Sequence, residues 1–219
     1  MPYPEPDRLV FVWERDTRRD PGSRLEASPG NFLDWRARTR AFEGLAAMEP
    51  FGLDWVSPKG PEYLPTWLVT ERFFELLGIV PLHGRTFRPD EHHAGRGRVV
   101  ILGYGIWQRR FGGDPAVLGQ VLTLDREPFE VVGVMPREFE LMDDAVWAPK
   151  IWEGWEAQSR NSRFYTVIGR VRNDVTLDRA TDDMNRIAAQ LGTEYPETNA
   201  GMAQVRNSLQ VSAAGLRGG

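Results

Sequence analysis

The three histidines of the chain fall within one loop region and are the first candidates for metal chemistry. His83 is followed by the run Asp90-Glu91-His92-His93. Adjacent histidines on extended backbone point to opposite sides, and the sequence has no HxH, HxxxH or HExxH spacing that would bring two imidazoles to one ion. We therefore predict a solvated polar loop here and no metal site.

A second candidate is the pair Gly103-x-Gly105, because glycines after a strand let backbone amides approach a pyrophosphate. The dinucleotide fingerprint fails at its third glycine, where Gln108 stands, and the acidic residue expected about 20 positions on would be Asp125, in a turn. No GxxxxGK[ST] motif occurs, so the chain cannot itself be an ATPase. We predict structural turn glycines and no bound cofactor.

Paired carboxylates are the remaining candidates for catalysis, since two of them about 5 to 10 Å apart can hydrolyse a glycoside. Asp143-Asp144 is predicted to form a turn, and Asp182-Asp183 to lie on the solvated side of a helix. There is no cysteine and no GxSxG motif for nucleophilic catalysis. We predict no catalytic residue and no enzyme, with a carbohydrate-active enzyme as the weakest hypothesis.

The composition restricts the classes of protein to which the chain can belong. It has 219 residues, 41% of them hydrophobic, and a formal net charge of −4, with Lys59 and Lys150 as the two lysines. No basic tail supports nucleic-acid binding, and the absence of cysteine excludes disulfides and thiolate sites. No apolar run reaches the ~20 residues that span a bilayer, and residues 1–8 are not a signal peptide. We therefore expect this chain itself to be soluble.

The first third of the chain shows alternating strand and helix patterns. Residues 9–13 predict a strand. A helix is then predicted, with Ser28 before Pro29 as its N-cap or, as the alternative, Asn31 followed by Asp34, and with an apolar stripe formed by Phe32, Trp35, Thr39, Phe42, Leu45 and Met48. Residues 51–55 and 63–69 predict a hairpin across a turn rich in Pro and Gly. Residues 71–77 predict a short helix that Gly78 ends.

Residues 98–136 form the densest part of the pattern. Residues 99–102 predict a buried strand, residues 106–111 a short helix that stops at Gly112-Gly113, and residues 121–134 a hairpin around a charged turn. Trp107 falls on a predicted apolar face of this segment.

The last third repeats the arrangement of the first. Residues 164–172 alternate like a half-buried strand, Thr176 caps a helix whose apolar positions continue to Leu191, and residues 204–211 predict a last strand. Residues 151–161 show no clear pattern, and their role stays open. For Trp152 and Trp155, packing against the parent domain is the leading interpretation and an exposed surface that contacts a partner is the alternative, whereas Trp35, Trp55 and Trp107 are predicted to be core.

The patterns therefore predict the order strand, helix, strand at each end of the chain and mostly strands in the middle. This predicts an α+β (mixed α/β) fold with a discontinuous domain that carries an insertion.

The order of several residue groups resembles the MacB-like periplasmic core domain of FtsX/MacB-type ABC transporter permeases. The groups in the middle of the chain are Phe73-Phe74, Leu77-Gly78, Gly84-Arg85-Thr86-Phe87, residues 99–102, Trp107, Phe111-Gly112, Asp114-Pro115, Gly119, residues 131–136, Trp147 and Pro149. A second set resembles the acidobacterial orphan permease branch: Ser28-Pro29, residues 31–35, residues 169–171 and residues 195–199.

The resemblance implies a division of the chain. Residues 1–69 and 161–212 would form a porter-like βαβ subdomain, residues 70–160 an inserted, mainly β subdomain, and residues 213–219 a disordered tail. In the family, this domain lies between a first transmembrane helix and a later membrane bundle, so we interpret the chain as the soluble piece of a permease.

The resemblance also implies a function. It implies a non-catalytic extracytoplasmic (periplasmic) domain at the inner membrane that relays ATP-driven conformational change to substrate export. The implied partners are a second permease copy and a cytoplasmic ABC ATPase, with a periplasmic adaptor protein as a further candidate and no nucleic acid. The alternative is a stand-alone soluble ligand-binding or adaptor domain derived from such a permease. The transported substrate and the oligomeric state of the isolated domain stay open.

Overall fold

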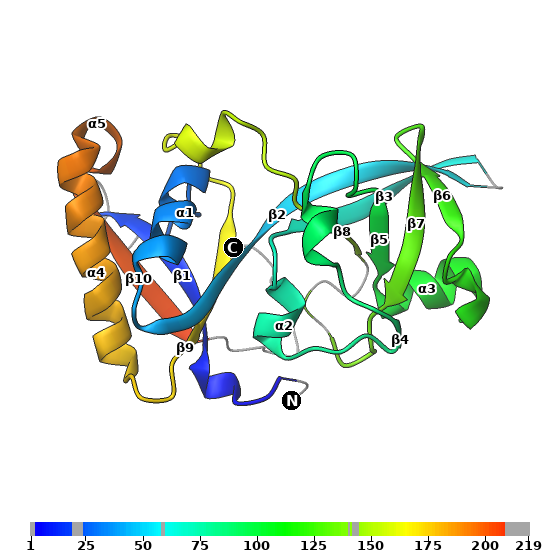
Figure 1. Cartoon of the computed structure of the whole chain (residues 1–219), viewed down its shortest axis with the longest axis horizontal. Helices are drawn as coiled ribbons and strands as arrows, with labels where there is room; N and C mark the ends of the chain where they lie inside the picture. Colours follow the sequence, from blue (N-terminus) through cyan, green and yellow to red (C-terminus); the bar gives the residue numbers. More distant parts are fainter. Residues whose placement is uncertain (1–2, 19–23, 58–59, 140, 142–144, 209–219) are drawn as a thin grey trace. The chain divides into compact units, whose positions relative to one another are not determined.

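The computed structural model describes residues 3–18, 24–57, 60–139, 141 and 145–208, and these residues form two compact units (Figure 1). The end unit contains residues 5–48 and 153–208, and the inserted unit contains residues 3–4 and 49–152. The predicted mixed α+β fold is confirmed, since helices and strands occur in both units.

The end unit is built on a four-stranded antiparallel sheet in the order β10-β1-β9-β2. Its strands are β1 (Leu9–Asp16), the first part of β2 (Phe42–Ser57), β9 (Thr166–Val171) and β10 (Met202–Ser208). Strand β9 lies between β1 and β2 and is antiparallel to both, so β1 and β2 are parallel to each other. Strand β1 likewise lies between β9 and β10 and is antiparallel to both, so β9 and β10 are parallel to each other. The unit is therefore two interleaved split β-α-β motifs, as in ferredoxin-like folds.

The end unit contains two longer helices, whose apolar side chains are buried in its core. In α1 (Pro29–Arg38), the Ser28 side chain accepts a hydrogen bond from the backbone N–H of Asn31, which confirms the predicted cap. Helix α4 (Leu177–Glu194) is capped by Thr176, also as predicted. It packs against α1 and β10 (Figure 1) and buries Ala180, Met184, Ile187, Ala188 and Leu191. Burying a large apolar side chain contributes about 1.5–3 kcal/mol.

The prediction that the first helix continues to Met48 is wrong. The helix ends at Arg38, and Phe42, Leu45 and Met48 lie in β2, where they pair with β9. All four residues from Leu45 to Met48 are buried. A strand that is buried on both faces loses its alternation, and residues three apart then imitate a helical stripe.

The strand predicted over residues 164–172 exists, as β9, but all six of its residues are buried. The prediction of a half-buried strand is therefore wrong. Its polar-looking positions Gly169 and Arg170 lie between two neighbouring strands and not at a solvated edge.

In the inserted unit, six strands close into a ring in the order β2-β3-β8-β5-β7-β6 and back to β2. The remaining strands are β3 (Gly60–Val69), β5 (Val99–Leu102), β6 (Val121–Leu124), β7 (Glu127–Val134) and β8 (Val146–Pro149), with the two-residue β4 (His83–Gly84) at the end of β7. The ring closes where Trp55 pairs with Leu124. Asp125 supports the closure because its carboxylate accepts from the Asp54 N–H at 2.8 Å.

The interior of the ring is the core of the inserted unit. Helix α3 (Tyr104–Phe111) adds Ile106 and Trp107, and the Trp107 indole N–H donates to the carbonyl of Asp114 at 2.9 Å. Trp35, Trp55 and Trp107 are all buried, as predicted. The other buried members of this core are Leu53, Leu64, Val100, Leu102, Val117, Leu122, Leu124, Val131, Val134, Val146 and Ala148.

Shorter elements complete the two units. Helix α2 (Phe73–Leu77) ends at Gly78, whose φ of 71° is left-handed, as the predicted stop requires. Its Phe74 packs edge-on against Trp147, with ring centroids 5.6 Å apart. The other short elements are η1 (Pro6–Arg8), η2 (Pro89–His92), η3 (Pro115–Val117), η4 (Glu156–Gln158) and α5 (Pro196–Asn199).

The boundaries between the units differ from those proposed for the subdomains at 69/70 and 160/161. The structure divides the chain at 48/49 and 152/153. The second part of β2 and all of β3 belong to the inserted unit because they pair with β6 and β8. The tail predicted over residues 213–219 lies outside the described residues.

The close approach at Gly133 generates a prediction. A Cβ atom at this position of β7 would lie 2.4 Å from the backbone carbonyl oxygen of Arg85. We expect Gly133→Ala to lower the free energy of unfolding by about 1–3 kcal/mol, measured by urea denaturation. Gly154→Ala is the matched control, because a Cβ there meets nothing within 4 Å. Equal denaturation midpoints for the two variants would contradict the prediction.

Candidate functional site

The structure divides the predicted histidine loop into a buried part and an exposed part. Glu91 and His92, at the end of η2, are each 7% exposed, whereas Asp90 and His93 lie at the surface. The prediction of a solvated loop is therefore wrong for Glu91 and His92. Within the described residues, no group of three or more His, Cys, Asp or Glu side chains is arranged to hold a metal ion.

Both buried side chains have hydrogen-bonding contacts within the fold. Arg85 donates to both carboxylate oxygens of Glu91, at 2.6 and 2.8 Å, and the Arg88 N–H donates at 2.7 Å. Burial opposes the ionisation of Glu91, but these hydrogen bonds outweigh it and lower the pKa of its carboxyl. For His92, burial is the largest effect and lowers the pKa of its imidazole below the ordinary 6.5, so the ring is neutral at pH 7. Its Nδ1 lies 3.3 Å from the carbonyl oxygen of Lys150.

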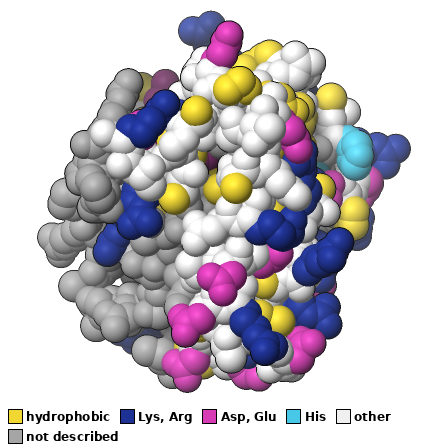
Figure 2. Space-filling view, turned by 90° about the vertical axis from the view of Figure 1, so that its left-hand side faces the viewer, with side chains coloured by type: hydrophobic (Ala, Val, Ile, Leu, Met, Phe, Trp, Pro, Cys, Tyr) yellow, Lys and Arg dark blue, Asp and Glu magenta, His cyan; other side chains and the backbone are white. Residues whose placement is uncertain are grey.

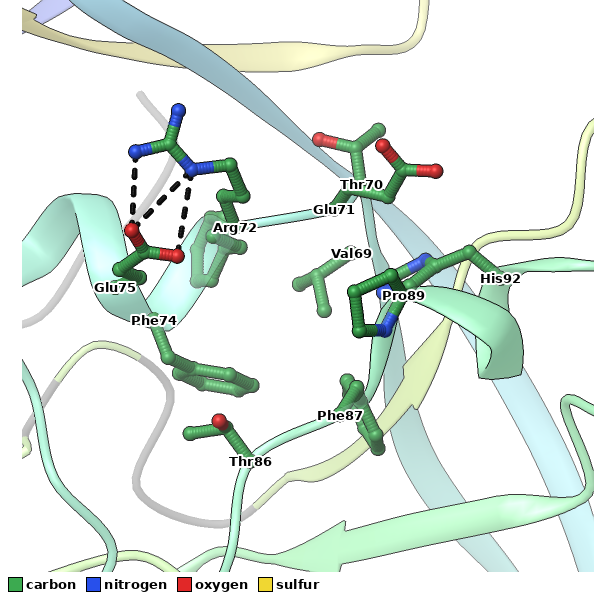
Figure 3. A pocket seen from close by; sticks show the side chains of 11 residues that line it. Val69, Thr70, Glu71, Arg72, Phe74, Glu75, Thr86, Phe87, Pro89 and His92 are labelled. Carbon is green, nitrogen blue, oxygen red and sulfur yellow. Dashed lines mark hydrogen bonds and ion pairs between the residues drawn. The ribbon is translucent and has the colours of Figure 1, made fainter.

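His92 also lines a cavity of about 200 Å³ in the inserted unit (Figure 3). The cavity combines aromatic walls with a polar rim, and it is smaller than the ~300–1,000 Å³ usual for drug-sized ligands. The lining residues are Val69, Thr70, Glu71, Arg72, Phe73, Phe74, Glu75, Thr86, Phe87, Pro89 and His92. Sequence reasoning missed this site because its residues come from several separate loops and α2.

A second, more open hollow of about 650 Å³ lies in the end unit, between the η4 loop and the α4–α5 junction. Its basic residue Arg160 is engaged, because the guanidinium donates to Asn31 and Asp34 at 2.7 and 2.6 Å and lies 3.6 Å from the ring centroid of Tyr195. Carboxylates and hydroxyls form much of the remaining lining.

The glycines of the Gly103-x-Gly105 motif occupy the start of α3. Gly103 is the N-cap with a φ of −64°, and its N–H donates to the carbonyl oxygen of Ala145 at 2.9 Å. Gly105 is buried within the first turn of the helix. The Gly103 amide is thus already used within the fold.

The two carboxylate pairs are in different situations. Asp143-Asp144 lies outside the described residues. Asp182 is exposed on α4, as predicted, but Asp183 is not an ordinary solvated residue. Asp183 accepts hydrogen bonds from the Thr39 hydroxyl, the Arg40 N–H and Arg186 at 2.9, 2.8 and 2.7 Å. Burial opposes its ionisation, but these partners lower the pKa of its carboxyl, so Asp183 joins α4 to the end of α1.

A fully buried carboxylate that sequence reasoning missed lies at the centre of the end unit. Glu14 of β1 is 0% exposed and accepts from the Asn31 side chain at 2.7 Å and from Arg163 Nε at 2.6 Å. Asn31 and Asn199 donate to each other at 3.1 and 2.9 Å. Burial raises the pKa of Glu14 although Arg163 and the hydrogen bonds act to lower it. This cluster connects β1, α1, α5 and the segment before β9.

The tryptophans of the unpatterned segment differ in exposure. Trp155 is 55% exposed, as predicted, and its indole N–H donates to Glu153 at 2.5 Å, while Trp152 is half-buried. On the face of the molecule that carries α4, acidic and basic side chains are interspersed, without a large area of one sign (Figure 2).

The ion pair between Glu14 and Arg163 generates a prediction with a pH dependence. Arg163→Gln leaves a buried carboxylate without its charge partner, and we expect it to lower the free energy of unfolding by about 3 kcal/mol at pH 7. The pKa of Glu14 is already above its ordinary 4.5 in the folded state, and removing Arg163 raises it further. As the pH rises from 4.5 through the raised pKa of Glu14, the buried carboxyl ionises in the folded state, and this ionisation lowers the free energy of unfolding.

The penalty relative to wild type should thus shrink as the pH falls from 7 towards 4.5, measured by urea denaturation at a series of pH values. Arg172→Gln is the matched control, since Arg172 pairs with Asp174, which is 72% exposed. We expect that variant to change stability little at any pH. A pH-independent penalty for Arg163→Gln would show that Glu14 is not its cause.

Comparison with known proteins identifies the family. The MacB-like periplasmic core domain profile matches residues 3–187. The macrolide export ATP-binding/permease protein MacB of Burkholderia thailandensis is 32% identical over 85 residues, which are 37% of this chain and 13% of that protein. The chain thus spans a small part of this relative.

Solved structures share the fold. A domain assigned to a permease protein of Porphyromonas gingivalis matches with a TM-score of 0.69 at 15% identity, covering 94% of this chain and 91% of that one. The periplasmic region of MacB from Actinobacillus actinomycetemcomitans matches with a TM-score of 0.62 at 15% identity, covering 92% and 88%. Over the part of the chain that the structure describes, no helix has the length and apolar composition needed to cross a bilayer.

These findings confirm the predicted family and its periplasmic placement. The chain belongs to the MacB-like periplasmic core domain family and is a periplasmic domain of a MacB-type ABC transporter permease.

Proposed function

We propose that this domain relays an ATP-driven conformational change to the export of a substrate and catalyses no reaction itself. The ATPase acts in the cytoplasm, the membrane segments of the permease carry its motion across the bilayer, and this domain is the part that moves outside. A second permease copy provides the surface against which it moves. The Burkholderia thailandensis relative is an ATP-binding/permease protein for macrolide export, which supports a coupling of this kind.

The pairing of β1 with β10 is the observation that carries this proposal. These strands are the first and last of the described chain, and they are hydrogen-bonded neighbours from Val10↔Ser208 to Asp16↔Met202. A displacement of the chain before β1 or after β10 would therefore act on two neighbouring strands of the same sheet. Two hydrogen-bonded strands of one sheet cannot be displaced independently of each other, so this pairing suits a movement of the end unit as a rigid body.

The interior of the end unit supports the same role. The Glu14 cluster connects β1 to α1 and α5, and Asp183 joins α4 to the end of α1. Fully satisfied buried polar networks make a unit rigid. Such a unit moves as one body when its strands are displaced.

The relay predicts a distance change that ATP drives. This chain has no cysteine, so in a full permease whose cysteines outside these 219 residues have been replaced, Asp182→Cys on the exposed side of α4 places one spin label on each copy. We expect pulsed electron paramagnetic resonance to show a shift in the distance between the two labels when ATP binds, since closure of the ATPase moves the attached domains. The control is the same labelled permease with an inactive ATPase, in which no shift is expected.

Export that proceeds with an unchanged distance distribution would overturn the relay. The alternative, a stand-alone soluble ligand-binding or adaptor domain, predicts a gene without transmembrane segments on either side of these residues. Finding such segments, together with the ATP-driven shift, would exclude it.

A further inference from the structure

The cavity beside His92 has an aromatic wall and a polar rim on opposite sides. The rings of Phe74 and Phe87 lie 5.9 Å apart between centroids, and those of Phe87 and His92 lie 6.0 Å apart. Val69, which is fully buried, forms the inner wall between them (Figure 3). At these separations Phe87 is in contact with both other rings, so the three form one continuous aromatic wall, against which the ring of a ligand can pack from the cavity side.

The charges on the rim are not balanced. Arg72 and Glu75 form an ion pair at 3.0 Å, so each has its own partner (Figure 3). Glu71 is exposed on the same rim, and no ion pair or hydrogen bond joins its carboxylate to another residue that the structure describes. The net charge that this rim presents to a ligand is therefore negative.

The contact between His92 and the carbonyl of Lys150 fixes the position of the proton on this ring of the lining. A backbone carbonyl can only accept, so the contact with Lys150 requires the proton on Nδ1 of the neutral ring. Nε2 then carries a lone pair and no proton. At the rim, the Glu71 carboxylate is an acceptor beside the aromatic wall, while the cation of the rim, Arg72, is paired with Glu75.

We propose that this cavity binds a small aromatic amine in its cationic form. The ring of the ligand packs against the wall formed by Phe74, Phe87 and His92, and its ammonium group lies at the rim against Glu71. A volume of about 200 Å³ admits one ring with a short chain and not a drug-sized molecule. Aromatic walls favour a cation in addition, since their faces attract positive charge. An anion of the same shape would be repelled by the negative charge of the Glu71 carboxylate.

The test compares three ligands of nearly one shape on the 219-residue chain by isothermal titration calorimetry and ligand-observed NMR. They are 2-phenylethylamine, 2-phenylethanol and phenylacetate, which are cationic, neutral and anionic at pH 7.5. We expect the amine to bind most tightly and phenylacetate most weakly. Glu71→Gln should weaken binding of the amine about tenfold, because it removes a charge-assisted hydrogen bond, and should leave the alcohol unchanged.

Two further variants locate the site. Glu127→Gln removes the same charge from an exposed residue of the inserted unit that pairs with Arg98 and does not line the cavity, so binding should be unchanged. Thr86→Leu adds volume to the lining and should abolish binding of the amine and the alcohol. Its unfolding midpoint is measured alongside, and if this variant does not fold, the Glu71→Gln comparison decides alone.

Three results would overturn the proposal: no binding of the amine at millimolar concentration, equal binding of amine and alcohol that Glu71→Gln does not change, or preferential binding of phenylacetate. The proposal does not rest on the relay, so its failure would leave the proposed function unaffected.

Discussion

The rest of the end unit depends on the insertion of β9 between β1 and β2. Residues 166–171 must pair with β1 on one side and with the first part of β2 on the other, although the whole inserted unit separates them from β2 in sequence. All six residues of β9 are buried, so the pairing removes a complete strand from water. Contacts of such sequence separation are costly in chain entropy. The inserted unit, whose ring of strands has its own core, shortens the effective loop once it has folded.

The buried cluster around Glu14 explains why two distant motifs of the sequence occur together. Asn31 lies in the segment after Ser28-Pro29, and Asn199 ends the segment of residues 195–199; their side chains bond each other beside Glu14. Burying a carboxylate costs free energy that the ion pair with Arg163 offsets only in part, in agreement with the raised pKa of Glu14. Such a cluster therefore selects one arrangement of its elements, since any other would leave the charge without partners.

The two units contribute different properties to a periplasmic permease domain. The end unit joins the first and last strands of the described chain in one sheet, which suits the transmission of motion. The inserted unit closes its strands into a ring and carries the aromatic cavity near His92. The proposed role of the end unit and the cavity of the inserted unit are compatible in one chain, because each unit has its own buried core.

The sequence by itself determined the features that depend on neighbours along the chain: the caps at Ser28 and Thr176, the stop at Gly78, the hairpin of β6 and β7, and the family. Only the tertiary structure decided that residues 42–48 form a strand, because burial of both faces by distant elements removed the alternation that marks a strand. The burial of Glu14 and His92 and the cavity were equally hidden, since their partners are far away in sequence. Local patterns report propensity and capping, whereas burial and pKa are set by whichever residues the fold brings together.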